Sequence, residues 1–316
     1  MTNEIAFLFP GQGSQAVGMG RELAERFPLA AQTFAEADEA LGFPLSKLCF
    51  EGPEEDLRLT ENTQPAIMTV SVAAARVLAK QGITPALAAG HSLGEWSAHV
   101  IVGTLTFADA LRAVKARGAA MQKAVPAGEG AMAAVLALDA AQVAEACAEA
   151  ARETGLTVQA ANLNSPGQTV ISGAAAAVEK AAAICKAKGA RRAVMLPVSA
   201  PFHCALMQPA QEEVARVLSG ISMHDPRIPV AANVTGGLVT TADATRDALI
   251  RQVTGAVRWV DCVQALKSAG ADLFIEVGPG KVLCGLLKQV DPELKSMNVE
   301  DAASLEKTLA EIKSSK

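Results

Sequence analysis

The first hundred residues combine short apolar runs with longer stretches of helical periodicity. The run at 5–9 is apolar and stops at a proline and a glycine-rich turn, which is typical of a buried strand that ends in a loop. Apolar positions recur at helical spacing over 20–41, and a long apolar stretch over 64–81 also indicates a helix. Residues 86–89 then lead through a glycine turn into another apolar stretch at 95–102. This last segment predicts a strand, a sharp turn and a helix in succession.

The middle of the chain predicts shorter elements, and this pattern begins after a break rich in proline and glycine at 126–130. Short apolar runs alternate there with alanine-rich amphipathic helices. We expect, in order, a strand at 131–138, a helix at 140–153, strands at 158–161 and 169–172, a helix at 174–188 and a strand at 193–197. This βαββαβ order is that of a ferredoxin-like unit.

Beyond this unit the pattern returns to longer helices, with isolated strands expected at 230–232 and 273–277. The simplest fold is α/β, with a small domain inserted into a large one. We expect a large α/β-hydrolase-like domain formed by residues 1–127 and 198–316, and a ferredoxin-like small subdomain formed by residues 128–197.

Composition excludes several classes of protein. Half of the 316 residues are apolar, which allows a large core. A net charge of -5 and the absence of tyrosine give no basic, base-stacking surface, so nucleic acid is not an expected partner. The apolar run at 5–9 is too short for a signal peptide or a membrane span. We therefore expect a cytoplasmic protein with no membrane partner.

The six cysteines are scattered along the chain and form neither a C-x-x-C pair nor a close cluster with histidine. We expect them to be reduced thiols, and we expect no metal site. They are Cys49, Cys147, Cys185, Cys204, Cys262 and Cys284.

The glycine turn at 90–94 reads G-x-S-x-G and contains Ser92. A serine hydroxyl is a weak nucleophile at neutral pH, so it must be exposed on a sharp turn near a base and near donors for an oxyanion. The two glycines permit such a turn, and the backbone N–H of Leu93 lies at the start of the following helix. Because a five-residue pattern also arises by chance, a purely structural turn is the alternative.

A base for Ser92 must come from four histidines. His91 adjoins the serine, but adjacent side chains on a tight turn usually point apart. His99 falls on the predicted helix, and His224 lies in a polar run typical of a surface. His203 lies in the loop after the inserted unit, where it could face a cleft between the domains. From the residues alone, a hydrogen-bonded loop histidine is an equal interpretation of His203.

Several spaced motifs together resemble the malonyl-CoA:acyl carrier protein transacylases and the related acyltransferase domains of polyketide synthases. The resemblance extends over nearly the whole chain. Its motifs are Phe9-Pro10-Gly11-Gln12-Gly13-Ser14-Gln15, Thr63-Gln64-Pro65-Ala66, Gly90-His91-Ser92-Leu93-Gly94-Glu95, Arg117-Gly118 with Met121-Gln122, Pro201-Phe202-His203, and Glu276-Val277-Gly278-Pro279-Gly280-Lys281-Val282-Leu283.

The resemblance implies that Ser92 is the nucleophile and that His203 is first base and then acid. It also implies that the backbone N–H groups of Gln12 and Leu93 hold the oxyanion. Arg117 would bind the free carboxylate of a malonyl group, which suits a guanidinium fork. On the sequence alone, a solvated charge on a helix is the better interpretation of Arg117.

The family orients its histidine by a main-chain carbonyl, and Gln252 matches that position. An ordinary helix residue is the alternative for Gln252. Phe202 stands where some bacterial members have serine, and it resembles the Phe-His pair of malonyl-selective polyketide domains. A phenyl ring there is expected to crowd the α-methyl group of methylmalonate.

Further substrate contacts are expected from His91 and Asn162. Asn162 and Asn164 follow a predicted strand, where asparagines are more often turn formers. A basic cluster is a candidate docking patch for an acidic carrier protein, with a solvated helix end as the alternative. The cluster comprises Lys186, Lys188, Arg191 and Arg192.

The activity expected is ping-pong transfer of malonyl from malonyl-CoA to the phosphopantetheine thiol of acyl carrier protein, in fatty acid or polyketide biosynthesis. Coenzyme A enters as a thioester substrate, and no cofactor is expected. We expect a monomer. A serine thioesterase or esterase shares the serine and the base and is the first alternative; a non-catalytic carrier-binding protein is the second.

Overall fold

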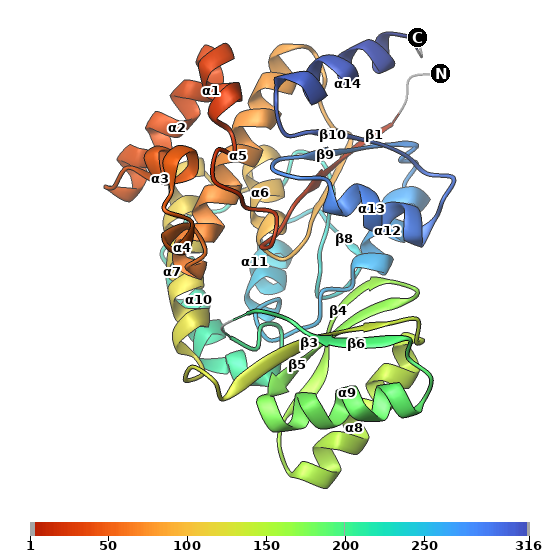
Figure 1. Cartoon of the computed structure of the whole chain (residues 1–316). Helices are drawn as coiled ribbons and strands as arrows, with labels where there is room; N and C mark the ends of the chain where they lie inside the picture. Colours follow the sequence, from red (N-terminus) through yellow and green to blue (C-terminus); the bar gives the residue numbers. More distant parts are fainter. Residues whose placement is uncertain (1–3, 199, 315–316) are drawn as a thin grey trace.

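The computed structural model describes residues 4–198 and 200–314, which fold as a mixed α/β structure around two separate sheets (Figure 1). The larger sheet has six strands in the order β10-β9-β1-β2-β7-β8. Neighbouring strands run parallel except β8, which pairs antiparallel with β7. The strands are β1 (Ile5–Phe9), β2 (Leu87–Gly90), β7 (Val230–Ala231), β8 (Leu238–Val239), β9 (Leu273–Val277) and β10 (Lys295–Val299).

The central strand β1 is apolar at every buried position because helices cover both faces of the sheet. Phe7 and Phe9 pack into one core cluster, and Ala6 and Leu8 pack into another. A parallel strand buried on both faces gives a continuous apolar run instead of an alternating pattern. The register sets Phe9 beside Gly90, so the carboxyl ends of β1 and β2 lie together.

Twelve helices of the described chain surround this sheet, and α5 lies deep among them with most of its residues buried. The helix expected over 20–41 is wrong as a single element. It is divided into two helices at Phe27, which has an extended backbone and precedes Pro28. The helices are α1 (Arg21–Arg26), α2 (Pro28–Leu41), α3 (Leu45–Glu51), α4 (Glu54–Leu57), α5 (Thr60–Lys80), α6 (Leu93–Ile101), α7 (Phe107–Lys123), α10 (Gln208–Ser219), α11 (Ala242–Arg251), α12 (Trp259–Ser268), α13 (Val282–Val290) and α14 (Ala302–Ser314).

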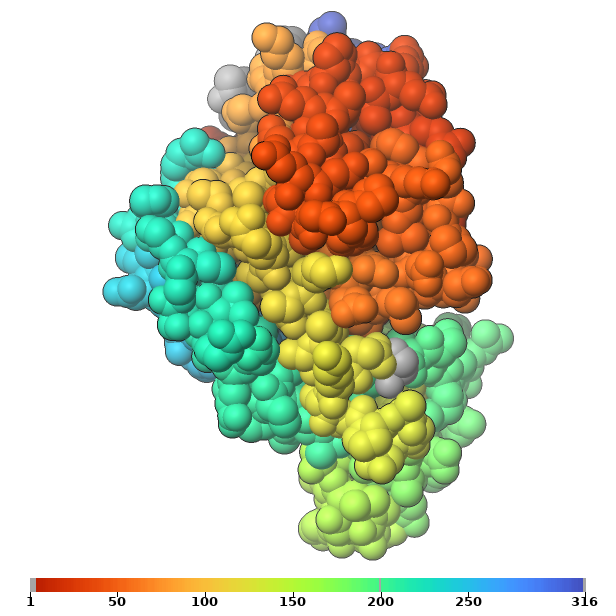
Figure 2. Space-filling model, turned by 90° about the vertical axis from the view of Figure 1, so that its left-hand side faces the viewer, coloured from red at the N-terminus to blue at the C-terminus, as the bar shows by residue number. Residues whose placement is uncertain are grey.

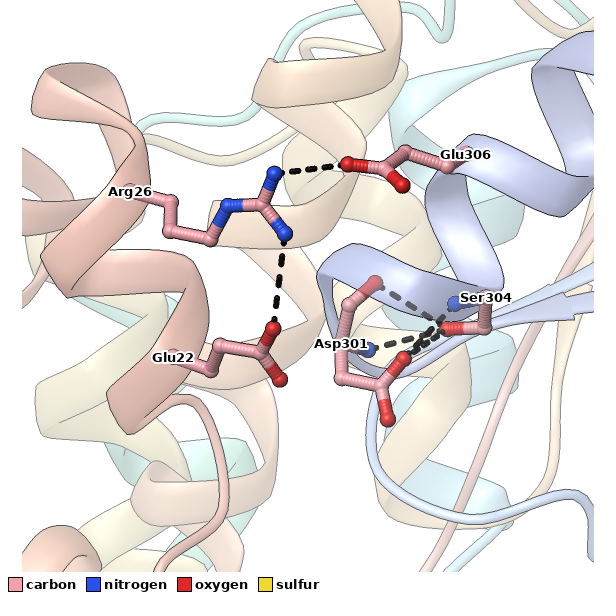
Figure 3. A network of polar contacts seen from close by, with 5 residues as sticks. All are labelled: Glu22, Arg26, Asp301, Ser304 and Glu306. Atoms are coloured by element: carbon pink, nitrogen blue, oxygen red, sulfur yellow. Dashed lines mark hydrogen bonds and ion pairs between the residues drawn. The ribbon is translucent and has the colours of Figure 1, made fainter.

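Polar contacts join the first helix to the last (Figure 3). Nη2 of Arg26 on α1 lies 2.6 Å from Oε1 of Glu306 on α14, and Nη1 lies 3.6 Å from Oε1 of Glu22 on its own helix. These side chains are about half exposed, so each pair contributes little to stability. Ser304 and Asp301 bond reciprocally through side chain and backbone and so cap the start of α14.

The second sheet has four antiparallel strands in the order β4-β5-β3-β6, with α8 and α9 packed on one face (Figure 1). Its elements follow one another as strand, helix, strand, strand, helix, strand, which confirms the predicted order. They are β3 (Gly130–Leu136), α8 (Ala140–Thr154), β4 (Val158–Ser165), β5 (Gln168–Ala174), α9 (Ala175–Ala187) and β6 (Arg192–Met195). We refer to these elements as the small unit and to the rest of the fold as the large unit.

Strand β4 attaches the small unit to the large one. It extends to Ser165, beyond the expected 158–161, because its second half contacts the loop before α12. Val257 donates its N–H to Ala161 and accepts from the N–H of Leu163, each at 2.8 Å. The hydroxyl of Ser165 donates to Gln289 on α13 at 2.9 Å. The two units are therefore joined by backbone as well as side-chain bonds.

Within the described chain, no helix is both long enough and apolar enough to cross a bilayer. The six cysteines are free, and all are buried except Cys284, which is partly buried.

Candidate active site

Ser92 occupies the sharp turn between β2 and α6, with φ 50° and ψ -103°. Such a positive φ is uncommon for a residue with a Cβ and costs about 1–3 kcal/mol. The flanking glycines let the elements approach, because a Cβ on Gly90 would lie 1.9 Å from the carbonyl carbon of Gly94. One on Gly94 would lie 2.0 Å from the carbonyl oxygen of Phe9. The G-x-S-x-G pattern therefore does form the strained turn that the sequence predicts.

Two amides from distant segments hold the backbone of this turn. Asn233, which follows β7, accepts from the N–H of Ser92 at 2.7 Å and donates to the carbonyl of Gly90 at 2.8 Å. Gln252 donates from Nε2 to the carbonyl of Ser92 at 3.0 Å. Asn233 was not identified from the sequence. Its only local signal is a polar residue after a short strand, which is more often a turn former.

His203 faces the serine, with Nε2 2.7 Å from Ser92 Oγ. Its Nδ1 lies 2.9 Å from the main-chain carbonyl of Gln252. A carbonyl only accepts, so Nδ1 carries the proton and Nε2 is free to accept from the serine hydroxyl. Burial, with a smaller contribution from the Arg117 cation, lowers the pKa of the imidazole to about 3. His203 is thus a neutral acceptor at neutral pH.

The other histidines are placed differently. His99 is buried in α6, and His224 is exposed. The Nε2 atom of His91 lies 2.9 Å from Oδ1 of Asn164. Burial lowers the pKa of His91, although the hydrogen bond with Asn164 acts in the opposite direction.

Arg117 projects from α7 into the interior beside Ser92 and is 1% exposed. Its Nη2 donates to Ser92 Oγ at 3.0 Å and to Oε1 of Gln252 at 2.8 Å. Its Nη1 donates to Oε1 of Gln64 at 2.8 Å. Burial lowers the pKa of Arg117 to about 10, which leaves it cationic at neutral pH. The solvated helix charge favoured by the sequence alone is wrong.

Glu95 and Gln64 complete the polar network, and the sequence assigned no role to either. Oε2 of Glu95 accepts from the N–H of Asn233 at 3.0 Å and from Nε2 of Gln252 at 2.6 Å. Burial raises the pKa of this carboxyl to about 7, although both hydrogen bonds and the charge of Arg117 favour the ionised form. Both residues belong to motifs quoted above, but the motifs do not indicate which residues they contact.

Gln12 and Leu93 lie on the two turns that the register of β1 and β2 brings together. Leu93 is the first residue of α6, so its N–H lies at a helix N-terminus. Gln12 is exposed on the turn after β1, and the N–H of His91 donates to the carbonyl of Phe9 at 3.0 Å. Both residues line the cavity that contains Ser92.

This cavity has a volume of about 680 Å³ and lies between the two units. In Figure 2 the orange part of the large unit lies above the green small unit on the same face. Phe202, Asn162 and His91 line the cavity, whereas Asn164 bonds His91 and Gln168. The lining is Gln12, Gly13, Gln15, Glu55, Arg58, Leu59, Gln64, His91, Ser92, Leu93, Arg117, Met121, Met132, Asn162, Leu196, Pro197, Val198, Phe202 and His203.

The four basic residues of the proposed docking patch are exposed at the end of α9 and the start of β6. Lys188 lies 3.5 Å from Glu145 of α8. Strand β6 is an edge of the small sheet, and its Val194 and Met195 are exposed at 49% and 43%. Basic and apolar side chains therefore occur together beside Leu196 and Pro197 of the cavity wall.

In the described part of the chain, no three residues among His, Cys, Asp and Glu gather as they would around a metal ion. What the site does contain is a serine hydroxyl bonded to a neutral imidazole, with a buried cation on the same oxygen. A base on Oγ raises its nucleophilicity, and a cation beside it favours negative charge on that oxygen or on a bound group.

Known proteins match this chain over nearly its full length. The acyl transferase domain family matches residues 6–309. The malonyl CoA-acyl carrier protein transacylase of Escherichia coli (strain K12) is 50% identical over 303 residues, which cover 96% of this chain and 97% of the relative. The enzyme of the same name from Bacillus subtilis (strain 168) is 48% identical over 311 residues, covering 98% of each.

Solved structures give the same result. An acyl carrier protein S-malonyltransferase from Vibrio cholerae has a TM-score of 0.94 at 49% identity, covering 96% of this chain and 99% of that one. A malonyl-transacylase solved in complex with its type II PKS acyl-carrier protein has a TM-score of 0.94 at 47% identity, covering 98% and 99%. The chain therefore belongs to the acyl transferase domain family and is an acyltransferase.

Proposed function

We propose that this acyltransferase moves a malonyl group from malonyl-CoA to the phosphopantetheine thiol of acyl carrier protein, in fatty acid or polyketide biosynthesis. The observation that carries the proposal is the buried Arg117 guanidinium, 3.0 Å from the oxygen that forms the acyl ester. A fixed cation there favours an acyl group with a free carboxylate. The names of the relatives from Escherichia coli and Bacillus subtilis support the same substrate and carrier.

The reaction we infer is ping-pong. Ser92 Oγ attacks the thioester carbonyl while Nε2 of His203 takes the hydroxyl proton. The backbone N–H groups of Gln12 and Leu93 donate to the oxyanion of the tetrahedral intermediate. The C–S bond then breaks, the proton passes from His203 to the coenzyme A sulfur, and a malonyl-serine ester remains. The carrier thiol reverses these steps, giving its proton to His203 and taking the malonyl group.

Orientation of the base follows from one contact. The main-chain carbonyl of Gln252, 2.9 Å from Nδ1 of His203, fixes the tautomer that leaves Nε2 free to accept. The carbonyl also stabilises the imidazolium that forms during transfer. No carboxylate in the third position is needed for this role.

Acyl selection is assigned to Arg117 and Phe202. The malonyl carboxylate would take hydrogen bonds from the Arg117 guanidinium, which is already aimed at the serine. Phe202 lies beside the base on the cavity wall. Its ring would crowd an α-methyl group, and a pocket contact of this size discriminates by about 10- to 200-fold. Comparable turnover of malonyl-CoA and methylmalonyl-CoA would remove the role of Phe202.

The remaining assignments complete the proposal. Coenzyme A is a substrate thioester, and the inferred steps call for no resident cofactor. The carrier would meet the basic docking patch, with β6 at the rim of the cavity, because acidic carriers and basic surfaces attract. We retain residues 128–197, which contain the small unit, as a ferredoxin-like subdomain inserted into a hydrolase-like domain of 1–127 and 198–316. A cytoplasmic monomer remains our prediction.

Intact-mass measurement tests the function directly. The protein is mixed with malonyl-CoA and then with carrier protein. We expect a malonyl mass on the wild type, none on Ser92→Ala, and discharge to the carrier faster than to water. Faster discharge to water would indicate a thioesterase, and no acyl-serine at all would indicate a carrier-binding protein.

Arg117→Ala tests the carboxylate site in the same assay. We expect loss of malonyl loading with retention of loading by a short neutral acyl group. Arg112→Ala is the matched control, because Arg112 lies on the same helix but is 55% exposed and pairs with Asp109. Equal loss of both acyl groups in Arg117→Ala would contradict the role of Arg117.

A further inference from the structure

Glu95 is a buried acid that the reaction described above does not use. It lies on α6 three residues after the nucleophile and is 0% exposed. Among the described residues, its Oε1 has no hydrogen-bond partner, and its Oε2 accepts from two donors. An acid with one unpaired buried oxygen costs stability, so the fold alone gives little reason for it.

The contact that matters is the one with the side-chain amide of Gln252. Nε2 of this amide donates to Oε2 of Glu95 at 2.6 Å and to the carbonyl of Ser92 at 3.0 Å. Oε1 of the same amide accepts from Nη2 of Arg117 at 2.8 Å. The amide is therefore held between an acceptor on one side and a donor on the other.

Rotation of this amide by half a turn would exchange its two ends. The NH2 group would then face the Arg117 guanidinium, which only donates, and the oxygen would face Glu95 and the Ser92 carbonyl, which accept. Arg117 would lose one of its three side-chain acceptors in the site, the others being Gln64 and Ser92. The acceptor oxygen of Glu95, at the shortest of these distances, acts together with the Ser92 carbonyl and Arg117 to make one amide orientation the stable one.

We propose that Glu95 is a positioning residue that fixes the Gln252 amide, and through it the Arg117 guanidinium, so that the site prefers acyl groups with a carboxylate. This inference rests on the proposed malonyl transfer. The Gln252 carbonyl that orients His203 belongs to the main chain, whereas the amide that contacts Glu95 and Arg117 belongs to the side chain, so loss of Glu95 acts on the carboxylate site more than on the base. The consequence is a change in acyl preference as well as in rate.

Two substitutions of Glu95 distinguish the effect of its hydrogen-bond acceptor from the effect of its side-chain volume. Glu95→Gln keeps the length and one oxygen that accepts from both Asn233 and Gln252, and it places an NH2 group where Oε1 lies. Glu95→Met keeps the length and fills the space but offers no acceptor to either donor. Glu95→Ala is made in parallel, because it removes the acceptor without requiring a thioether to fit in the same space.

The experiment measures kcat/KM for loading of Ser92 from malonyl-CoA and from acetyl-CoA by quenched intact-mass analysis, with thermal unfolding as a record of folding. We expect Glu95→Met and Glu95→Ala to lower the malonyl-to-acetyl ratio about 10-fold or more, since small displacements of a positioning group are costly. Glu95→Gln should stay within about 3-fold of the wild-type ratio, because its oxygen restores the contact.

Glu276→Met is the matched control. Glu276 is also a buried acid, but it accepts from the N–H groups of Leu283 and Cys284 at the start of α13 and does not line the cavity. Its replacement should lower stability and leave the acyl ratio unchanged.

An unchanged ratio in folded Glu95→Met and Glu95→Ala would overturn the proposal and reduce Glu95 to a structural residue. A fall of the same size in Glu95→Gln would also overturn it, because the acceptor would then not be the cause. Failure of the proposed function looks different: the wild type itself would show no malonyl-serine, or no preference for malonyl over acetyl.

Discussion

The strained backbone of Ser92 leads to a prediction about stability. Ser92→Ala and Ser92→Gly both remove the hydroxyl with its bonds to His203 and Arg117, but only the first keeps a Cβ at φ 50°. Glycine adopts positive φ without a steric cost. We therefore expect Ser92→Gly to be the more stable of two inactive proteins.

The magnitude follows from two opposing terms. Relief of a sparsely populated backbone conformation is worth about 1–3 kcal/mol. Glycine also gains freedom in the unfolded chain, which costs about 0.4–1 kcal/mol. The net advantage of Ser92→Gly over Ser92→Ala is thus about 1 kcal/mol, which corresponds to a shift on the order of 2 °C in unfolding temperature.

Ser97 supplies the control from the same helix. It is buried within α6, so Ser97→Ala should be more stable than Ser97→Gly by about 1 kcal/mol, the reverse order. Urea and thermal unfolding of the four variants measure both differences, and intact-mass analysis confirms that the Ser92 variants carry no acyl group. If Ser92→Gly is no more stable than Ser92→Ala while the Ser97 pair behaves as stated, the strain at the turn is not real.

Two further predictions concern the same turn. Gly94→Ala should lower stability by about 3 kcal/mol and abolish loading, because its Cβ would meet the carbonyl of Phe9. Gly285→Ala in α13 is the control and should be neutral or stabilising, because nothing lies within 4 Å of the added Cβ. Equal effects of the two substitutions would contradict the close approach of Gly94 to Phe9. The pKa of the Glu95 carboxyl is raised from 4.5 to about 7, so its contribution to stability is fully present below pH 4.5 and is lost as the pH rises to about 7. The unfolding free energy of the wild type relative to Glu95→Gln should therefore fall by about 1.4 kcal/mol per pH unit between these two pH values. A difference between these two proteins that does not change with pH in urea titrations would show that burial does not shift this carboxyl.

Much of the fold follows from local patterns in the sequence. Strand β9 was predicted with its observed bounds, and the element order of the small unit was also predicted. In both cases the apolar run or the helical period in the sequence indicates directly which residues are buried. The edge strands β8 and β10 were missed, since β8 has only two residues and most of β10 is only partly buried. Pairing, more than apolar content, defines them.

In the candidate site, too, features that depend on local sequence were predictable, and features that depend on distant contacts were not. Ser92 was predictable because glycines on both sides are a local requirement of the turn. The burial of Arg117 was not, because its acceptors, Gln64 and Gln252, lie far from it in the sequence. Asn233 and Glu95 bond each other across the fold, and a sequence contains no record of such a contact.

Ser92 precedes the small unit in the chain, and His203 follows it, yet their side chains meet at 2.7 Å. The segment from β3 to β6 therefore leaves the large unit after one member of this pair and rejoins it before the other. Strand β6 of the docking surface proposed above lies on this segment, so substitutions along it would change carrier recognition and leave Ser92 and His203 themselves unaltered. Under that proposal, partner recognition would be free to diverge separately from the chemistry.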